Sequence, residues 1–288
     1  LSLSGITKCF AGVPALREVD FEVRSGQIHA LIGENGAGKS TLINICTGVL
    51  QPDSGAILMD GRQAVIRNPQ QAAARGIVAV PQEAHLFAEL SVAENMLLGQ
   101  GLCRNRLGLI DWQATYGLAS EQLAAMDEEF DVNAPAGALN VGHRVLAQVA
   151  AAVAAGPRVL FLDEPFTGVD VKTEAAIIDL MRELRAQGHL MLVSTHNLGS
   201  VPDFCDQVVL VLHTVLASGP TKTTFTQANL ERAFGGVLRQ FRLDGADLHQ
   251  DDDRRSVTVL SDDERPVVFY GSKEGTDMHR PRQREEEE

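Results

Sequence analysis

The stretch QIHALIGENGAGKSTLINICT, residues 27–47, decides the fold of this chain. An apolar run over residues 28–32 predicts a buried strand, and residues 42–47 predict a helix. Between them, residues 33–40 match the phosphate-loop pattern G-x-x-x-x-G-K-[ST] at every position. A strand that runs through this pattern into a helix predicts an α/β protein that holds the phosphates of a nucleotide.

Each residue type in this loop has a physical role. Gly33, Gly36 and Gly38 adopt backbone angles that a Cβ forbids, so that successive N–H groups face phosphate oxygens. The helix that begins near Lys39 adds its positive N-terminal end. The Lys39 ammonium reaches the β and γ phosphates, and the Ser40 hydroxyl suits Mg²⁺. We therefore expect a nucleoside triphosphate with Mg²⁺ here, rather than an ordinary glycine-rich surface turn.

The composition is that of an ordinary soluble protein. With 44% hydrophobic and 22% charged residues, the 288-residue chain resembles neither a disordered nor a membrane protein. No signal peptide opens it, and no apolar run approaches the roughly 20 residues that span a bilayer. The net charge of -13 argues against nucleic acid as a partner, because that partner requires a basic surface. The cysteines lack paired spacing and are expected to be reduced thiols: Cys9, Cys46, Cys103 and Cys205.

Strand and helix signals divide the chain into three parts. We expect a nucleotide-binding domain over residues 1–235 with a helical subdomain at about 90–156, a small extension over 236–273, and a disordered acidic tail over 274–288. Strands are expected over residues 3–10, 19–23, 77–80, 158–164, 189–195 and 206–218, the last closed by a turn at Gly219 and Pro220, with a hairpin over 56–63 and weak strands over 256–260 and 266–270. Helices are expected over residues 69–75, 145–155, 171–187 and 226–234.

Three of these strands end in residues suited to phosphate chemistry. Gln82 follows strand 77–80, at the edge where open α/β sheets place ligand-facing residues, and is a candidate contact for Mg²⁺ or the attacking water. Asp163 and Glu164 close strand 158–164, where Asp163 suits Mg²⁺ and Glu164 suits activation or orientation of water. His196 follows another strand; a lone histidine is usually structural, but this position suits a bond to the γ-phosphate.

Two other residues keep alternative interpretations. Phe10, followed by Ala11 and Gly12, suits stacking on an adenine ring, but core packing is the better local explanation of a single phenylalanine. Asn140 precedes the alanine-rich helix, and capping of that helix explains it adequately.

The order of these motifs resembles the ATP-binding cassette subunits of transporters, with LNVGH at residues 139–143 and a turn containing Asp170 in their expected places. The resemblance spans residues 1 to about 235. It implies a RecA-like α/β core with an antiparallel lead-in and a helical subdomain. It also implies that the adenine of ATP stacks on Phe10, and that the phosphates are held by Gly33, Glu34, Asn35, Gly36, Ala37, Gly38, Lys39, Ser40 and Thr41.

The same resemblance implies the catalytic roles. Gln82 senses Mg²⁺ and contacts the coupling helix of a membrane subunit. Asp163 holds Mg²⁺ through water, and Glu164 is the general base. His196 touches the γ-phosphate, and Asp170 lies in a loop that contacts a second copy.

Residues 139–143 resemble the signature stretch of this family, whose Asn140, Gly142 and His143 complete the ATP site of the other subunit. Each site is then shared, and a monomer is expected to be nearly inactive. The family usually has Ser at the position of Asn140, and Gln or sometimes His at the position of His143. An Asn amide still donates a hydrogen bond, but its larger side chain misplaces the γ-phosphate, so we expect slower hydrolysis than with Ser.

The cargo signal is divided between two kinds of importer. Residues 1–157 resemble the first cassette of monosaccharide importers of the ribose and xylose type. From about residue 161 onward the chain resembles the single-cassette ATPases of manganese, iron and zinc importers, so it reads as a mosaic with a junction near residues 156–164. The single-cassette length favours the metal class slightly, whereas the region around Gln82 favours the sugar class.

The resemblance also implies partners and a location. They are a second copy of the chain, integral membrane permease subunits and, indirectly, a solute-binding protein, at the cytoplasmic face of the inner membrane. One alternative is a non-transport cassette ATPase of DNA repair or translation, which the acidic charge and the absence of coiled-coil heptads disfavour. Another is a non-hydrolysing nucleotide-binding subunit, which Asn140 motivates.

Overall fold

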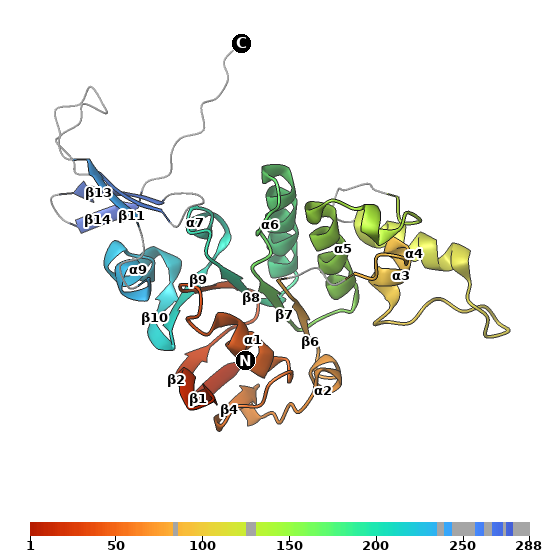
Figure 1. Ribbon diagram of the computed structural model, residues 1–288, viewed down its shortest axis with the longest axis horizontal. Helices are drawn as coiled ribbons and strands as arrows, with labels where there is room; N and C mark the ends of the chain where they lie inside the picture. Colours follow the sequence, from red (N-terminus) through yellow and green to blue (C-terminus); the bar gives the residue numbers. More distant parts are fainter. Residues whose placement is uncertain are drawn as a thin grey trace, which may run out of the picture.

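The computed structural model describes residues 1–82, 86–124, 131–234, 239–243, 257–261, 267–272 and 275–278. Three sheets organise these residues, and helices pack against the largest of them (Figure 1). The predicted α/β class is confirmed. Within the described ranges, no helix has both the length and the apolar character needed to cross a membrane.

The first sheet is antiparallel, with the strand order β2-β1-β4-β5. Its strands are β1 Ser2–Phe10, β2 Val13–Glu22, β4 Ser54–Met59 and β5 Arg62–Gln63. Ala11 and Gly12 join β1 to β2 as a two-residue hairpin turn with φ angles of 47° and 83°. Strand β2 therefore begins at Val13, and the expected start near residue 19 is wrong. An irregular register near Glu18, whose φ is 44°, conceals the alternation that would have revealed the earlier residues.

The central sheet has the order β10-β9-β3-β8-β7-β6. Its strands are β3 Ile28–Ile32, β6 Ile77–Val80, β7 Val159–Asp163, β8 Leu190–Thr195, β9 Gln207–Leu212 and β10 Thr214–Pro220. All neighbouring strands are parallel except β9 and β10. The loops that follow β3, β7 and β8 consequently leave the same edge of the sheet, where ligands bind in such folds.

The segment expected as one strand over residues 206–218 is a hairpin. Strand β9 ends at Leu212, His213 forms the turn with a φ of 59°, and β10 returns antiparallel. Gly219 and Pro220, where the turn was expected, lie at the end of β10. Glycine and asparagine are the usual signals for a positive φ, so a histidine in this conformation left no sequence signal.

Helices cover both faces of the central sheet (Figure 1). They are α1 Lys39–Cys46, α2 Pro69–Ala73, α3 Val92–Leu97, α4 Trp112–Ala124, α5 Val141–Ala154, α6 Val171–Ala186, α7 Val201–Phe204, α8 Thr221–Thr224 and α9 Gln227–Ala233, with a 3₁₀ turn at Ala136–Ala138. Helices α3, α4 and α5 pack together within the range expected for the helical subdomain.

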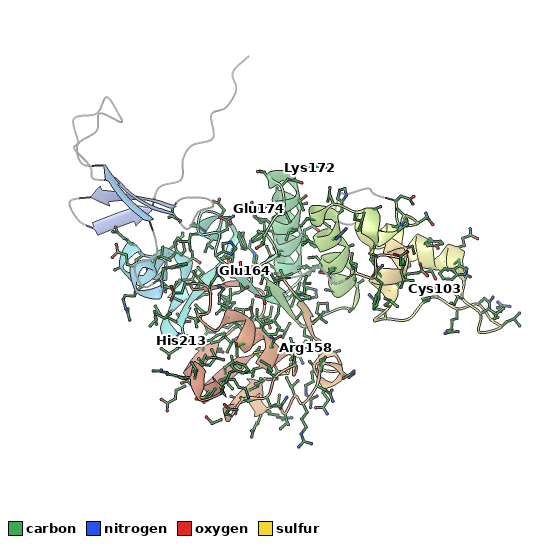
Figure 2. The ribbon with its side chains drawn as sticks, viewed as in Figure 1. Cys103, Arg158, Glu164, Lys172, Glu174 and His213 are labelled. Atoms are coloured by element: carbon green, nitrogen blue, oxygen red, sulfur yellow. The ribbon has the colours of Figure 1, made fainter. Side chains whose placement is uncertain are left out.

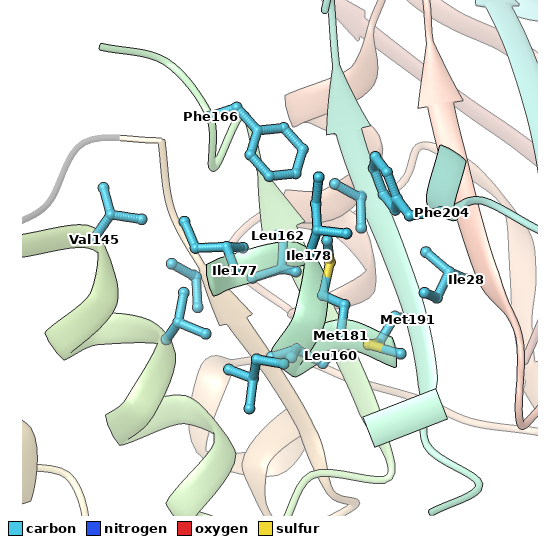
Figure 3. Close-up of a cluster of buried hydrophobic side chains, with 14 of the residues drawn as sticks. Ile28, Val145, Leu160, Leu162, Phe166, Ile177, Ile178, Met181, Met191 and Phe204 are labelled. Carbon is cyan, nitrogen blue, oxygen red and sulfur yellow. The ribbon is translucent and has the colours of Figure 1, made fainter. Parts of the chain in front are cut away.

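The buried strands send alternate side chains to two separate clusters. On one face, Leu160 and Leu162 of β7 belong to a cluster with Ile177 and Met181 of α6 (Figure 3). On the other face, Phe161 belongs to a cluster that includes residues of α1 and of the antiparallel sheet. Because both faces of the central sheet are covered, a ligand can approach its strands at their ends. The candidate site lies at the carboxyl ends.

A third, antiparallel sheet forms near the end of the chain, in the order β11-β12-β13-β14. Its strands are β11 Arg239–Leu243, β12 Val257–Ser261, β13 Val267–Ser272 and β14 Gly275–Met278. The two weak strands expected here correspond to β12 and β13. Residues 275–278, which fall within the predicted disordered tail, form β14 and pair with β13 despite their polar sequence. Residues 274 and 279–288 of the predicted tail lie outside the described residues.

Candidate nucleotide site

The phosphate loop joins β3 to α1 and has no space for larger residues at two positions. A Cβ on Gly33 would lie 2.2 Å from the Val211 carbonyl oxygen, and one on Gly38 would lie 2.6 Å from the Leu16 side chain. Gly36 and Gly38 also have φ angles of 86° and 103°, which favour glycine. The glycines are therefore required by close packing as well as by backbone conformation.

Lys39 lies inside this loop with 6% of its surface exposed. Its ammonium donates to the Gly33 carbonyl at 2.7 Å and to the Glu34 carbonyl at 3.4 Å. It also lies 3.3 Å from Glu164 Oε1. One buried cation thus links the phosphate loop to the residue that follows β7.

Asp163 and Glu164 are positioned by Ser194, a residue that the sequence analysis did not select. The Ser194 hydroxyl donates to Asp163 Oδ1 at 2.5 Å and accepts from the Glu164 N–H at 3.0 Å. Parallel register places Ser194 directly opposite Asp163 on neighbouring strands. The available signal was a hydroxyl pair, Ser194 and Thr195, closing an otherwise apolar strand.

Glu164 is a buried carboxylate with a partner on each oxygen. His196 donates its N–H at 3.1 Å and its ring Nδ1–H at 2.7 Å to Oε2, while Lys39 faces Oε1. Burial raises the pKa of Glu164, but the His196 hydrogen bond and the Lys39 charge outweigh it and leave that pKa below its ordinary value. Glu164 is therefore ionised near neutral pH, as a general base requires. Figure 2 labels Glu164 near the middle of the molecule.

The remaining loop residues frame this centre. Ser40 is exposed in the first turn of α1, and Asp163 keeps one carboxylate oxygen beyond its bond to Ser194. Mg²⁺ usually binds through one or two protein oxygens while retaining waters and substrate phosphates, so these two residues fit that ion. Of the other predicted phosphate ligands, Ala37 is buried, whereas Glu34, Asn35 and Thr41 are partly or fully exposed.

Phe10 and Gln82 lie outside the core. Phe10 ends β1 with 46% of its surface exposed, and the Lys8 ammonium lies 5.8 Å from the centre of its ring. The local preference for core packing of Phe10 is therefore wrong, and its ring is accessible to a ligand. Gln82 is exposed beyond the end of β6, the edge strand next to β7.

The signature stretch packs against the turn that contains Asp170. Asn140 caps α5 by accepting the His143 N–H at 2.7 Å, as predicted. Asp170 caps α6 by accepting the Thr173 N–H at 2.9 Å. Gly142 is buried between the two helices, because a Cβ there would lie 2.8 Å from Thr173 Oγ1.

The contact between Gly142 and Thr173 fixes the start of α5 against the start of α6. The hydrogen bonds from Thr173 lower the pKa of the Asp170 carboxyl despite a smaller opposing effect of desolvation. Asn140 itself is exposed. The cap uses only its side-chain oxygen, so the side-chain NH2 group takes no part in the cap. The structure brings Lys39, Asp163, Glu164 and His196 together. Residues 139–143 lie apart from them beside the Asp170 turn, with Asn140 and Val141 exposed and Gly142 buried.

Comparison with known proteins gives consistent matches. A family described as "ABC transporter" matches residues 16–167. The chelated iron transport system membrane protein YfeB of Yersinia pestis is 42% identical over 261 residues, which cover 90% of this chain and 87% of that protein. The ribose import ATP-binding protein RbsA of Chromobacterium violaceum is 39% identical over 209 residues, covering 72% of this chain and 41% of that protein. The chain thus spans less than half the length of this sugar-import relative.

Solved structures agree at the level of the fold. The ADP conformation of MJ1267, an ATP-binding cassette of an ABC transporter, superposes with a TM-score of 0.71 and 26% identity, covering 82% of this chain and 98% of that one. A dimeric structure of the cassette MJ0796 has a TM-score of 0.66 at 24% identity, covering 76% of this chain and 97% of that one.

Proposed function

Because this chain belongs to the ABC transporter family of ATP-binding cassettes, we propose that it is the ATP-hydrolysing subunit of a bacterial importer. The observation that carries the proposal is the meeting of Lys39, Glu164 and His196 beside the phosphate loop. This arrangement supplies a cation for phosphates, an ionised base and a group that holds the base in place.

Each residue has a distinct chemical task in this proposal. The phosphate loop binds the phosphates through backbone N–H groups and the Lys39 ammonium. Glu164 orients a water and accepts its proton, and His196 keeps the carboxylate aimed through two hydrogen bonds. Ser40, Asp163 and Gln82 would hold Mg²⁺, which supplies positive charge beside the phosphates. Phe10 offers an accessible ring for the adenine.

A second copy of the chain completes each site in this proposal. The stretch with Asn140, Gly142 and His143 lies beside Asp170, with Asn140 exposed, His143 partly exposed and Gly142 packed against Thr173, and would contact another copy through its exposed side. The dimeric cassette among the structural neighbours supports this assembly. ATP closes the dimer and hydrolysis reopens it, so that the cycle drives integral membrane permease subunits.

Chelated iron or a related metal ion is our favoured cargo. The match to YfeB extends over 90% of this chain and therefore across residues 156–164, where the sequence resemblance changes from one importer class to the other. A monosaccharide is the second candidate, supported by the match to RbsA over 72% of the chain. In either case a solute-binding protein delivers the cargo, and this subunit lies peripherally at the cytoplasmic face of the inner membrane.

Shared sites predict that activity depends on protein concentration. We expect Mg²⁺-dependent ATP turnover per chain to rise with the concentration of the purified protein, because dimers form by mass action. Phosphate release measured across a dilution series tests this. A constant rate per chain at all dilutions would contradict shared sites, and ATP binding without any turnover would support the non-hydrolysing alternative.

Replacing Asn140 by Ser should raise ATP turnover by about two- to tenfold, the value of one better-placed hydrogen bond. Serine caps helices as well as asparagine does, so the substitution preserves the start of α5. The matched control is Asn68→Ser, because Asn68 caps α2 through an equivalent 2.9 Å bond from the Gln71 N–H. Equal turnover of Asn140→Ser and the unmodified chain would show that Asn140 does not limit hydrolysis.

A further inference from the structure

The turn between β9 and β10 consists of a single residue in an unusual conformation. His213 has a φ of 59°, in the left-handed region that glycine adopts freely and other residues adopt at a cost. It is partly buried, and Figure 2 labels it on the side of the molecule where β10 passes β2. A histidine held in this conformation needs contacts that maintain it.

Three hydrogen bonds fix His213 between the phosphate loop and β2. Its N–H donates to the Ala37 carbonyl at 2.9 Å, and its own carbonyl accepts the Arg17 N–H at 2.7 Å. Its ring Nδ1 lies 3.2 Å from the Ala15 carbonyl oxygen, which only accepts, so Nδ1 carries the hydrogen. One residue therefore joins a loop of the parallel sheet to a strand of the antiparallel sheet.

The hydrogen bond from His213 to the Ala37 carbonyl also orients the N–H of the next residue, Gly38. A trans peptide is planar, so its C=O and N–H point in opposite directions. When the Ala37 carbonyl faces His213, the Gly38 N–H therefore faces away from His213. The orientation of a potential phosphate donor is thus set from outside the site.

The segments that contain Ala15 and Val211 also pack closely against two glycines of the phosphate loop. The Cβ position of Gly33 is filled by the Val211 carbonyl, close to His213 in sequence. The Cβ position of Gly38 is filled by the Ala15 carbonyl, at 2.8 Å, and by the Leu16 side chain. The Ala15 carbonyl that blocks Gly38 is also the one that His213 holds, so a shift of that strand would reach the loop directly.

We propose that His213 is a positioning residue for nucleotide binding, which sets the phosphate loop against β2 through Ala37 and Ala15. The inference rests on the proposed ATPase function. It assigns to His213 no contact with the nucleotide. The imidazole acts through the strand and loop that it holds together.

The variant His213→Gly tests this assignment. Glycine keeps the turn and its main-chain hydrogen bonds but removes the ring and its bond to Ala15. We expect the Kd for ATP, measured by titration calorimetry, and the KM to rise about three- to tenfold, the range for one lost hydrogen bond. We expect kcat at saturating ATP to stay within about twofold, because Glu164 and His196 are untouched.

Stability provides the readout that separates positioning from general damage. Relief of backbone strain opposes loss of the hydrogen bond, so the thermal midpoint without nucleotide should stay within about 3 °C. The matched control is Asp60→Gly, at another non-glycine residue with positive φ, 52°, in the turn between β4 and β5. It should leave both Kd and KM unchanged.

Distinct results overturn distinct statements. An unchanged Kd and KM in His213→Gly would refute the positioning role. So would a higher Kd accompanied by a comparable loss in kcat and a large fall in the thermal midpoint, since that combination indicates general destabilisation. If the unmodified chain itself fails to bind ATP, the proposed function fails instead.

Discussion

Glutamine in place of Glu164 should lower ATP turnover by about three orders of magnitude, within the range of general-base catalysis. The amide is nearly isosteric but accepts no proton from water. ATP binding should persist, because removing a negative charge from a site for phosphates does not weaken it. Steady-state phosphate release gives the first quantity, and equilibrium ATP binding gives the second.

The control for this variant is Glu94→Gln. Glu94 is another partly buried carboxylate with hydrogen bonds, in the capping box of α3, where glutamine also serves. Its turnover should match that of the unmodified chain. A less than tenfold loss in Glu164→Gln would remove Glu164 from the role of base, whatever its geometry.

Alanine in place of Lys39 should raise the Kd for ATP by about 10- to 100-fold, the range for a charge-assisted hydrogen bond. The ammonium is buried in the loop and already donates to the Gly33 carbonyl, so it is held where phosphates would bind. The substitution also takes one of the two partners from the Glu164 carboxylate. Calorimetric titration with ATP measures the affinity.

Lys222→Ala is the control for lost positive charge, because Lys222 is exposed on α8. It should bind ATP with unchanged affinity. If Lys39→Ala binds within about threefold of the unmodified chain, which is less than one hydrogen bond to a charged group, Lys39 does not hold the phosphates.

The close approach of Lys39, Glu164 and His196 could be predicted from the sequence because two physical rules determine it. The phosphate loop needs glycine where no Cβ fits, and residues that follow parallel strands meet at one edge. These two rules bring together Lys39, Glu164 and His196, as the structure confirms. They say nothing about register, so the Ser194 hydroxyl opposite Asp163 was missed.

The errors arose where tertiary contacts override local preference. His213 occupies a left-handed turn without the usual glycine, because hydrogen bonds from two other segments hold it there. Local sequence favoured core packing of Phe10 over stacking on adenine, but a hairpin turn directly after it leaves its ring at the surface. Strand β14 forms by pairing with β13, and its short polar sequence does not indicate a strand.

The position of β3 has a consequence for how the chain is made. Strand β3 lies between β8 and β9, so both of its neighbours are synthesised long after it. Ile28 N–H reaches its acceptor, Asp206, across 178 residues. At about 5–20 residues per second, a ribosome needs roughly 10 to 35 s to cover that distance.

Through that interval the nascent chain carries its phosphate loop without the strands that close it. The sheet also interleaves early and late segments, because β3 and β6 precede residue 156 whereas β7, β8, β9 and β10 follow it. Neither portion forms the central sheet by itself. We therefore expect nucleotide binding only after β8 and β9 have been synthesised and have paired with β3.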